Sequence, residues 1–115
     1  MLIPMCKSKI RGGVVTDKNI HYEGSLTLDK KLIEKAELLL GEMIYLLNLN
    51  NGARIMTYVI EGEPGSGIIC ANGPAARFFE IGDPVIILSV SLMEKSEAMN
   101  YKTKIIELGK NNKIQ

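Results

Sequence analysis

The stretch "MIYLLNLNNGARIMTYVI", residues 43–60, predicts the fold most directly. Two apolar runs, 43–49 and 53–60, lie on either side of the triplet "NNG". Because Asn and Gly both accept a positive φ, this triplet favours a tight hairpin turn between two β-strands. In the second run, alternation along a strand puts four side chains on one face: Arg54, Met56, Tyr58 and Ile60. We therefore expect a β-hairpin that carries a cation and a phenol on the same side.

Gly and Pro punctuate the rest of the chain and divide it into short segments that are typical of strands. Segments rich in Val, Ile, Leu, Thr or Tyr predict further strands at 5–16, 25–28, 67–71, 85–92 and 102–107. A second turn is expected in "EGEPGSG", where Pro64 presets φ. Many short strands favour a mainly β fold, a small closed barrel, over a parallel α/β sheet.

One or two short helices are expected beside the strands. Asp29 can cap a helix that ends at Gly41, because five apolar residues recur at helical spacing between them: Leu32, Ile33, Ala36, Leu39 and Leu40. A second short helix is predicted at "GPAARFF", where Pro74 suits the first helical turn.

The composition limits the classes of function. A chain of 115 residues with 46% apolar and 23% charged residues predicts one domain, residues 1–115. The net charge of +1 gives no field that would attract nucleic acid or an anionic membrane, and no apolar run is long enough to span a bilayer. Two cysteines, Cys6 and Cys70, are too few for a disulfide framework and are interpreted as core residues, which fits a cytoplasmic protein. One histidine and two distant cysteines predict no metal site.

Gly24-Ser25, in "HYEGSLTLD", places a hydroxyl directly after a glycine and before a predicted strand. A serine hydrolase is not favoured, although His21 is near in sequence, because no G-x-S-x-G elbow surrounds Ser25. The simpler alternative is a hydroxyl that stabilises a turn.

Two cations also have alternative interpretations. Lys9 lies inside an apolar predicted strand, and Arg54 opens another. They are either solvated residues of edge strands or part of a cationic pocket for a small carboxylate. The glycines at 62, 65 and 67 match neither a dinucleotide fingerprint nor a P-loop, and we interpret them as turn residues.

Six segments, in order, resemble the aspartate 1-decarboxylase family, whose members use a pyruvoyl group to make β-alanine from L-aspartate. They are "KSKI", "YEGS", "NNGARIMTYVI", "PGSG", "NGPAAR" and "GDPVIILS", and they extend over roughly residues 5–91. The tail, with "YKTKIIEL" and "NNKI", is similar to the family's less regular C-terminal strand. The resemblance implies a double-psi β-barrel, a homotetramer, and a product that feeds pantothenate and coenzyme A synthesis.

The resemblance also implies that the chain cuts itself between Gly24 and Ser25, which gives chains 1–24 and 25–115. Ser25 would become the pyruvoyl group, which binds the substrate amine as a Schiff base, with no metal and no pyridoxal phosphate. A glycine at 24 would let the hydroxyl approach the carbonyl and would permit a strained backbone. By the same resemblance, Thr57 stabilises the oxyanion formed during cutting, and Tyr58 is the proton donor.

The substrate would contact residues that match the family's binding segments. Lys9 and Arg54 match positions near the carboxylates of the substrate. Thr57 and Asn72, with the loop Gly73, Pro74 and Ala75, match the substrate-contact residues, and Tyr22 is expected to line the same pocket.

Two positions depart from the family pattern. Arg11 stands where the family usually has histidine, within "RGG", and His21 does not replace that histidine by position. Pro74 stands where alanine is common, so no substrate bond from an amide N–H can form there.

Two alternatives to a mature enzyme stay open at the level of sequence. One is a non-catalytic barrel that binds a peptide or another protein. The other is an uncut precursor that needs a maturation helper protein before it becomes active.

Overall fold

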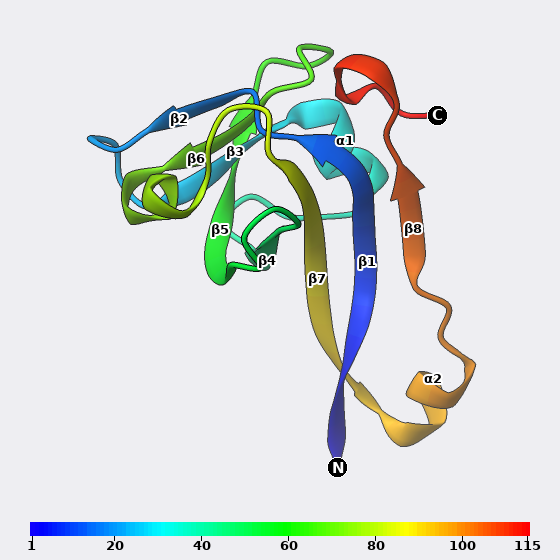
Figure 1. Cartoon of the computed structure of the whole chain (residues 1–115). Helices are drawn as coiled ribbons and strands as arrows, with labels where there is room; N and C mark the ends of the chain where they lie inside the picture. The colour runs from blue at the N-terminus through cyan, green and yellow to red at the C-terminus, as the bar shows by residue number, and fades with distance from the viewer.

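Eight β-strands form one mixed sheet in the computed structural model, which describes residues 1–115 (Figure 1). The strands are β1 (Leu2–Val14), β2 (Asp17–Asn19), β3 (Ser25–Asp29), β4 (Met43–Asn48), β5 (Arg54–Gly62), β6 (Ile69–Asn72), β7 (Pro84–Glu94) and β8 (Lys104–Glu107). Two α-helices, α1 (Lys30–Lys35) and α2 (Lys95–Asn100), and two 3₁₀ helices, η1 (Gly73–Phe78) and η2 (Lys110–Asn112), complete the chain. The predicted mainly β fold with short helices is confirmed.

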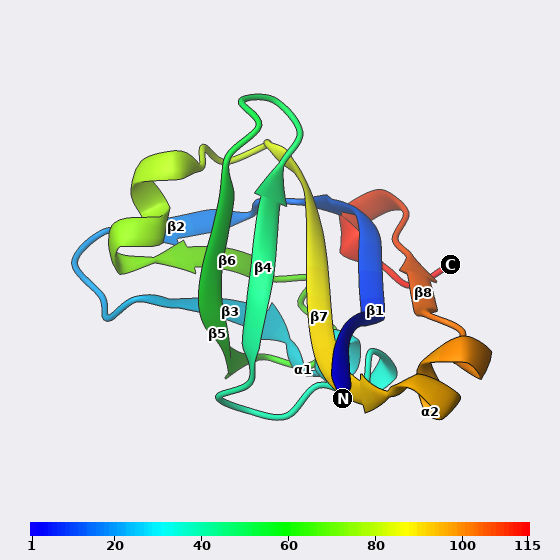
Figure 2. The ribbon, with the colours of Figure 1, turned by 90° about the horizontal axis from the view of Figure 1, so that it is seen from below.

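The strand order is β2-β6-β3-β5-β4-β7-β1-β8. Three neighbouring pairs are parallel, β1–β8, β2–β6 and β3–β5, and the other four are antiparallel. The chain leaves β1 and crosses to β2 at the opposite end of this order, where the Thr16 amide donates to the Ile69 carbonyl at 2.9 Å. This crossing brings the two ends of the sheet together, so the sheet curls around the core (Figure 2).

The predicted hairpin is formed by β4 and β5, with Met43 opposite Tyr58 and Leu47 opposite Arg54. Gly52 adopts φ +76° in its turn, as a residue of this tight connection must. Thr57 and Val59 are buried on the inner face of β5, whereas the four residues expected on one face point outward. The alternation read from the sequence is therefore confirmed.

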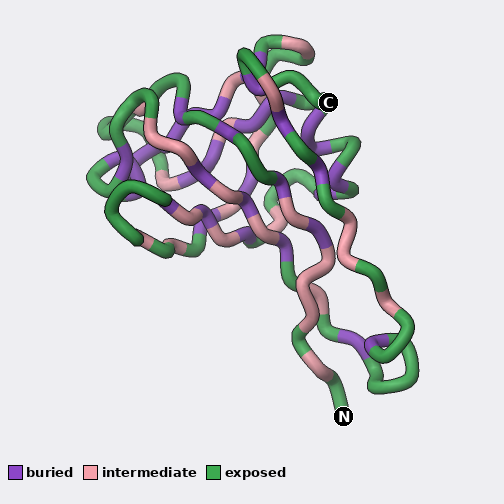
Figure 3. Tube along the Cα trace, turned by 45° about the vertical axis from the view of Figure 1, so that its right-hand side comes forward, coloured by how far each residue is buried: buried purple, intermediate pink, exposed green.

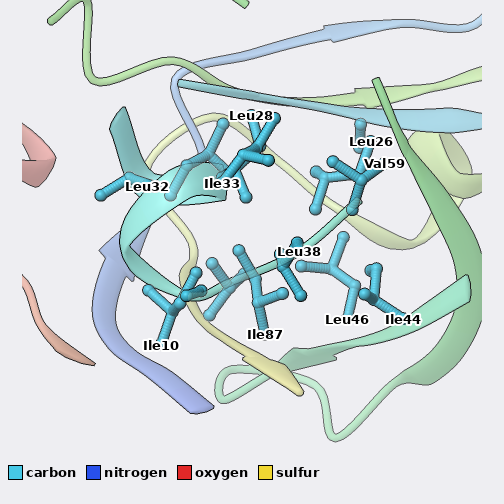
Figure 4. Packing of buried hydrophobic residues seen from close by; sticks show 14 of the residues in the cluster. Ile10, Leu26, Leu28, Leu32, Ile33, Leu38, Ile44, Leu46, Val59 and Ile87 are labelled. Carbon is cyan, nitrogen blue, oxygen red and sulfur yellow. The ribbon is translucent and has the colours of Figure 1, made fainter. Parts of the chain in front are cut away.

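Nineteen buried apolar residues form the core between the curled sheet and α1 (Figure 4). Leu26 and Leu28 of β3, with Val59 of β5, project into it, and Leu32 and Ile33 of α1 cover it from one end. The two leucines of β3 fix which face of this strand is internal, so Ser25 and Thr27 must project outward.

The first helix is shorter than predicted. Asp29 caps it as expected, with its side chain accepting from the Lys31 amide, but the helix ends at Lys35 because Glu37 adopts φ +58°. Leu39 and Leu40, expected on its apolar face, are instead 75% and 61% exposed. The segment "GPAARFF" is helical, as predicted, in the 3₁₀ form of η1.

Two features of the longer strands were not predicted. The register of β1 against β7 shifts between Ile10 and Gly13, and Gly12 adopts φ +80°, so "RGG" forms a bulge. A Cβ on Gly12 would lie 2.5 Å from the Leu108 carbonyl oxygen, which only glycine permits. The ends of β1 and β7 also extend beyond the main body with the unpredicted helix α2, and this arm is largely exposed or half-buried (Figure 3). No helix is long and apolar enough to cross a membrane.

Candidate active site

The strand β3 places Ser25 between two other predicted site residues. Antiparallel pairing with β6 puts Ser25 directly opposite Asn72. Parallel pairing of β3 with β5 joins Leu26 to Val59, so the preceding residues, Ser25 and Tyr58, lie beside each other where this ladder begins. Side chains of paired residues share a face, so Asn72, Ser25 and Tyr58 form one row on the outer face of the sheet.

The Ser25 hydroxyl has no exposed surface and is held by two hydrogen bonds. It donates to the Glu23 carbonyl oxygen at 3.2 Å and accepts from Asn72 Nδ2 at 3.0 Å. The same Asn72 nitrogen donates to Thr27 Oγ1 at 2.8 Å, and Asn72 Oδ1 accepts from the Cys70 thiol at 3.2 Å. Every polar atom of the Asn72 side chain is therefore engaged, and the hydroxyl cannot rotate without breaking a bond.

Gly73 brings the start of η1 against the segment that contains the predicted cleavage position. It adopts φ +65°, and a Cβ there would lie 2.7 Å from the Tyr22 carbonyl oxygen and 2.8 Å from the Gly24 amide nitrogen. Both features require glycine. Gly24 itself does not adopt a positive φ, so the strained backbone expected at Gly24 is not found in this form.

A cavity of about 300 Å³ adjoins this row. Five of the predicted site residues line it: Gly24, Thr57, Tyr58, Pro74 and Ala75. Thr57 points inward and Tyr58 outward on β5, and both residues are in the cavity lining. Both residues thus border one cavity within a single chain, although alternation puts their side chains on opposite faces of β5.

A second cleft lies along the same outer face, and Tyr22 borders this cleft rather than the first cavity. Its other lining residues are Asp17, Asn19, Thr27, Ile60, Glu61, Cys70 and Asn72. Burial, assisted by the nearby negative charge of Asp17, raises the pKa of the Cys70 thiol. The thiol therefore stays protonated at neutral pH and can donate its hydrogen.

The two predicted cations lie outside the cavity lining. The Arg54 guanidinium sits over the Tyr45 ring, 5.2 Å from its centroid. Lys9 is half-buried on β1, where it pairs with Leu88 of β7. Neither β1 nor β5 is an edge strand, so the interpretation of these cations as edge-strand residues is wrong.

The separation of Lys9 from the cavity follows from the register. Leu88 pairs with Tyr45, and Tyr45 pairs with Met56 of the cavity wall. Three strand spacings of about 4.8 Å therefore put Lys9 about 14 Å from Met56 along the sheet. Lys9 borders neither the cavity nor the second cleft of its own chain.

Comparison with known proteins assigns the family. The aspartate decarboxylase family model matches residues 1–115. The aspartate 1-decarboxylase of Thermoanaerobacter pseudethanolicus is 54% identical over 109 residues, which cover 95% of this chain and 93% of that protein. The aspartate 1-decarboxylases of Pelotomaculum thermopropionicum and Listeria innocua are 46% and 44% identical, over 99% and 100% of this chain and 86% and 91% of those proteins. The chain belongs to the aspartate decarboxylase family.

The departures from the family pattern now have a structural context. Arg11 forms an ion pair with Glu107 of β8, so its charge is already partnered. His21 is exposed and borders neither cavity. Pro74 lies at the cavity wall, where its Cδ is 3.5 Å from the position of a Cβ on Gly24. At position 74 this chain therefore presents an apolar ring to the cavity and has no backbone N–H to donate.

Sequence reasoning missed several residues of the site. Four apolar residues complete the cavity wall: Met43, Ile55, Met56 and Phe78. Thr27 and Cys70, which contact Asn72, were also missed. Alternation along β3 and β6 was the available signal, since Thr27 lies two residues after Ser25 and Cys70 two before Asn72, on the same faces as these residues.

Proposed function

We propose that this member of the aspartate decarboxylase family cuts its own chain between Gly24 and Ser25 and then decarboxylates L-aspartate to β-alanine. The observation that carries the proposal is the placement of Ser25. Its buried hydroxyl lies between the Asn72 amide and the Glu23 carbonyl, and the adjoining Gly24 borders a cavity of about 300 Å³. A serine that only stabilised a turn would not need to be buried between these two partners.

The cutting reaction needs water and no oxidant. Ser25 Oγ attacks the Gly24 carbonyl carbon, the C–N bond breaks, and an ester joins the two segments. Loss of the Ser25 Cα proton then expels the Gly24 carboxylate and leaves dehydroalanine. Its imine tautomer takes up water and releases ammonia, which leaves a pyruvoyl group at the new amino terminus of the 25–115 chain.

Thr57 is the proposed stabiliser of the negative charge that forms during the first step. Its side chain is buried and borders the same cavity as Gly24. A donor directed at a developing oxyanion lowers the barrier, because the charge is greater in the transition state than in the resting amide.

The residues around Ser25 fit a pyruvoyl group at this position. When present, this group supplies a ketone that condenses with the substrate amine and accepts the electrons left by the departing CO₂. We propose Tyr58 as the proton donor: its phenol hydroxyl would protonate the carbon that has lost CO₂, and its position beside residue 25 on the outer face supports this role. Asn72 and the amides of Gly73 and Ala75 are the proposed donors to the substrate, while Pro74 can donate none.

Arg54 and Lys9 are the proposed partners of the two substrate carboxylates. Arg54 is exposed and lies on the outer face of β5, as does Tyr58, and the Arg54 guanidinium lies over the Tyr45 ring. Because Lys9 does not border the cavity of its own chain, we propose that it serves the site of a neighbouring copy.

A homotetramer would provide such a neighbour. The outer face of the sheet carries exposed apolar side chains on four strands: Met43, Met56, Val90 and Ile105. Exposed apolar side chains gathered on one face of a sheet are typical of an interaction surface. We propose that copies of the processed chain bury it against one another in the cytoplasm, where the β-alanine they make would supply pantothenate and coenzyme A synthesis.

Intact-mass measurement tests the cutting step. Purified protein should convert from the full chain to fragments 1–24 and 25–115, with the second lighter by one ammonia than the same fragment beginning with serine. Conversion of purified protein by itself would remove the requirement for a helper protein, whereas conversion only after addition of cell extract would establish it. A Ser25→Ala chain that still decarboxylated aspartate would refute the proposal.

Borohydride trapping tests the substrate and the ketone together. Reduction in the presence of labelled L-aspartate should attach the label to the 25–115 chain. The matched control is Ser25→Ala protein, which should take up no label. Equal labelling of both proteins would contradict a ketone at residue 25.

A further inference from the structure

Cys70 makes a contact that neither the core packing nor the proposed chemistry explains. It lies on β6 two residues before Asn72, opposite Thr27, and it is 6% exposed. Its thiol donates to Asn72 Oδ1 at 3.2 Å, while Asn72 Nδ2 donates on the other side to the hydroxyls of Ser25 and Thr27. The Asn72 amide is therefore held from three directions.

The Cys70 thiol is the hydrogen-bond partner of the Asn72 amide oxygen, and the Ser25 and Thr27 hydroxyls are the partners of the amide nitrogen. In the uncut chain the Ser25 hydroxyl gives its proton to Glu23, so it must accept from Asn72. Cutting removes this hydroxyl. The bond from the Cys70 thiol then remains as the contact that holds the amide oxygen on the side away from residue 25.

We propose that Cys70 is a positioning residue, which fixes the Asn72 side chain with its N–H donors directed at residue 25 and, after cutting, at the bound substrate. Only the part about the bound substrate rests on the proposed function. A flipped amide would present an oxygen to the carboxylate of aspartate, and two acceptors repel each other. Cys70 thus acts through Asn72 and touches neither substrate nor the reacting atoms.

The surroundings keep the thiol in the donor form that this role requires. Burial and the charge of Asp17 both raise the pKa of Cys70. Thiol and hydroxyl groups are both hydrogen donors, so serine should replace cysteine in this role, whereas alanine should not.

The first test compares steady-state kinetics of three variants. Cys70→Ala should raise KM for L-aspartate about fivefold, the ratio that corresponds to one net hydrogen bond, and should change kcat less than about twofold. Cys70→Ser should restore KM. Cys6→Ala is the matched control, since Cys6 bonds to the Ser8 carbonyl and borders neither cavity. Equal KM values for Cys70→Ala and Cys6→Ala, or equal defects in Cys70→Ala and Cys70→Ser, would overturn the proposal.

The second test needs no activity. It uses uncut Ser25→Ala protein, in which the hydroxyl at residue 25 is absent. ¹⁵N NMR follows hydrogen exchange of the Asn72 side-chain amide. An Asn72→Asp variant assigns the signals of this amide. Adding Cys70→Ala should speed this exchange about fivefold, and adding Cys70→Ser should leave it within about twofold. Unchanged exchange with Cys70→Ala would overturn the pairing. If wild-type protein neither cuts nor decarboxylates, the proposed function fails, but this measurement still decides the role of Cys70 toward Asn72.

Discussion

Ser25 and Asn72 face each other across the β3–β6 ladder, with the Asn72 amide nitrogen 3.0 Å from the Ser25 hydroxyl. The antiparallel ladder fixes this relationship, because Ser25 is the first residue of β3 and Asn72 is the last residue of β6. The chain turns immediately afterwards at Gly73, which packs against Gly24. One pair of strands thus determines both the position of the hydroxyl and the path of the backbone that it is proposed to attack.

Gly73→Ala should prevent cutting. The added Cβ would lie within 3 Å of three backbone atoms of the Tyr22–Gly24 segment, so this segment must move away from Asn72. Gly52→Ala is the matched control, because Gly52 also has a positive φ but has no neighbouring atom within 4 Å of such a Cβ. Both variants should lose about 1 kcal/mol of stability from the left-handed backbone, and only Gly73→Ala should stay uncut by intact mass. Normal cutting of Gly73→Ala would show that this close packing is not required.

Thr57→Val should slow cutting about 10²-fold or more, because it removes a hydroxyl but keeps the shape of the side chain. Thr57→Ser keeps the hydroxyl and should cut within about tenfold of the wild-type rate. Rates are measured from the fraction of full-length chain in intact-mass spectra over time. If valine and serine slow cutting equally, the methyl group matters and the oxyanion role is wrong.

The hairpin could be predicted because its signals are local. The positive φ of Gly52 and the alternation in β5 are set by neighbouring residues, and the structure confirms both. The end of α1 could not be predicted from periodicity, since Leu39 and Leu40 continue the apolar pattern after the backbone has already left the helix at Glu37.

The sequence predicted which residues belong to the site better than it predicted how they are arranged in space. The resemblance identified Gly24, Thr57 and Tyr58, which the structure brings to one cavity. It could not separate Lys9 from them, because the distance depends on strand order, which is set by pairing between segments far apart in sequence. The contact of Cys70 with Asn72 was hidden for a related reason: a buried thiol looks like a core residue until the strand partner is known.

Asp29→Asn should make the fold less stable at neutral pH but not in acid. Burial raises the pKa of Asp29, but hydrogen bonds from the amides of Gly67, Lys31 and Gly65 outweigh burial and hold the pKa below its ordinary value. The stabilisation is therefore present above the pKa of an unfolded aspartate, about 3.9, and is lost as pH falls through the lower folded value. Urea unfolding of the uncut Ser25→Ala chain should show a loss of about 2 kcal/mol at pH 7.

The same loss should shrink toward zero in acid, once the pH has fallen below the lowered pKa of Asp29 and the carboxylate of the parent chain is itself protonated. Glu34→Gln is the control, because this exposed residue of α1 bonds to none of these amides. A loss that is equal at both pH values would mean that the shape of the side chain, and not its charge, holds the loop.

Two inactive variants should restore activity when they are expressed together, provided that Lys9 serves the site of a neighbouring copy. Lys9→Ala chains retain Ser25, and Ser25→Ala chains retain Lys9. In randomly mixed tetramers about a quarter of the sites would then receive both groups, so about a quarter of wild-type activity should return. The control pair is Ser25→Ala with Tyr58→Phe. Ser25 and Tyr58 are neighbours within one chain, so no site in that mixture would be intact. Activity in the control pair, or none in the first, would contradict a site divided between subunits in this way.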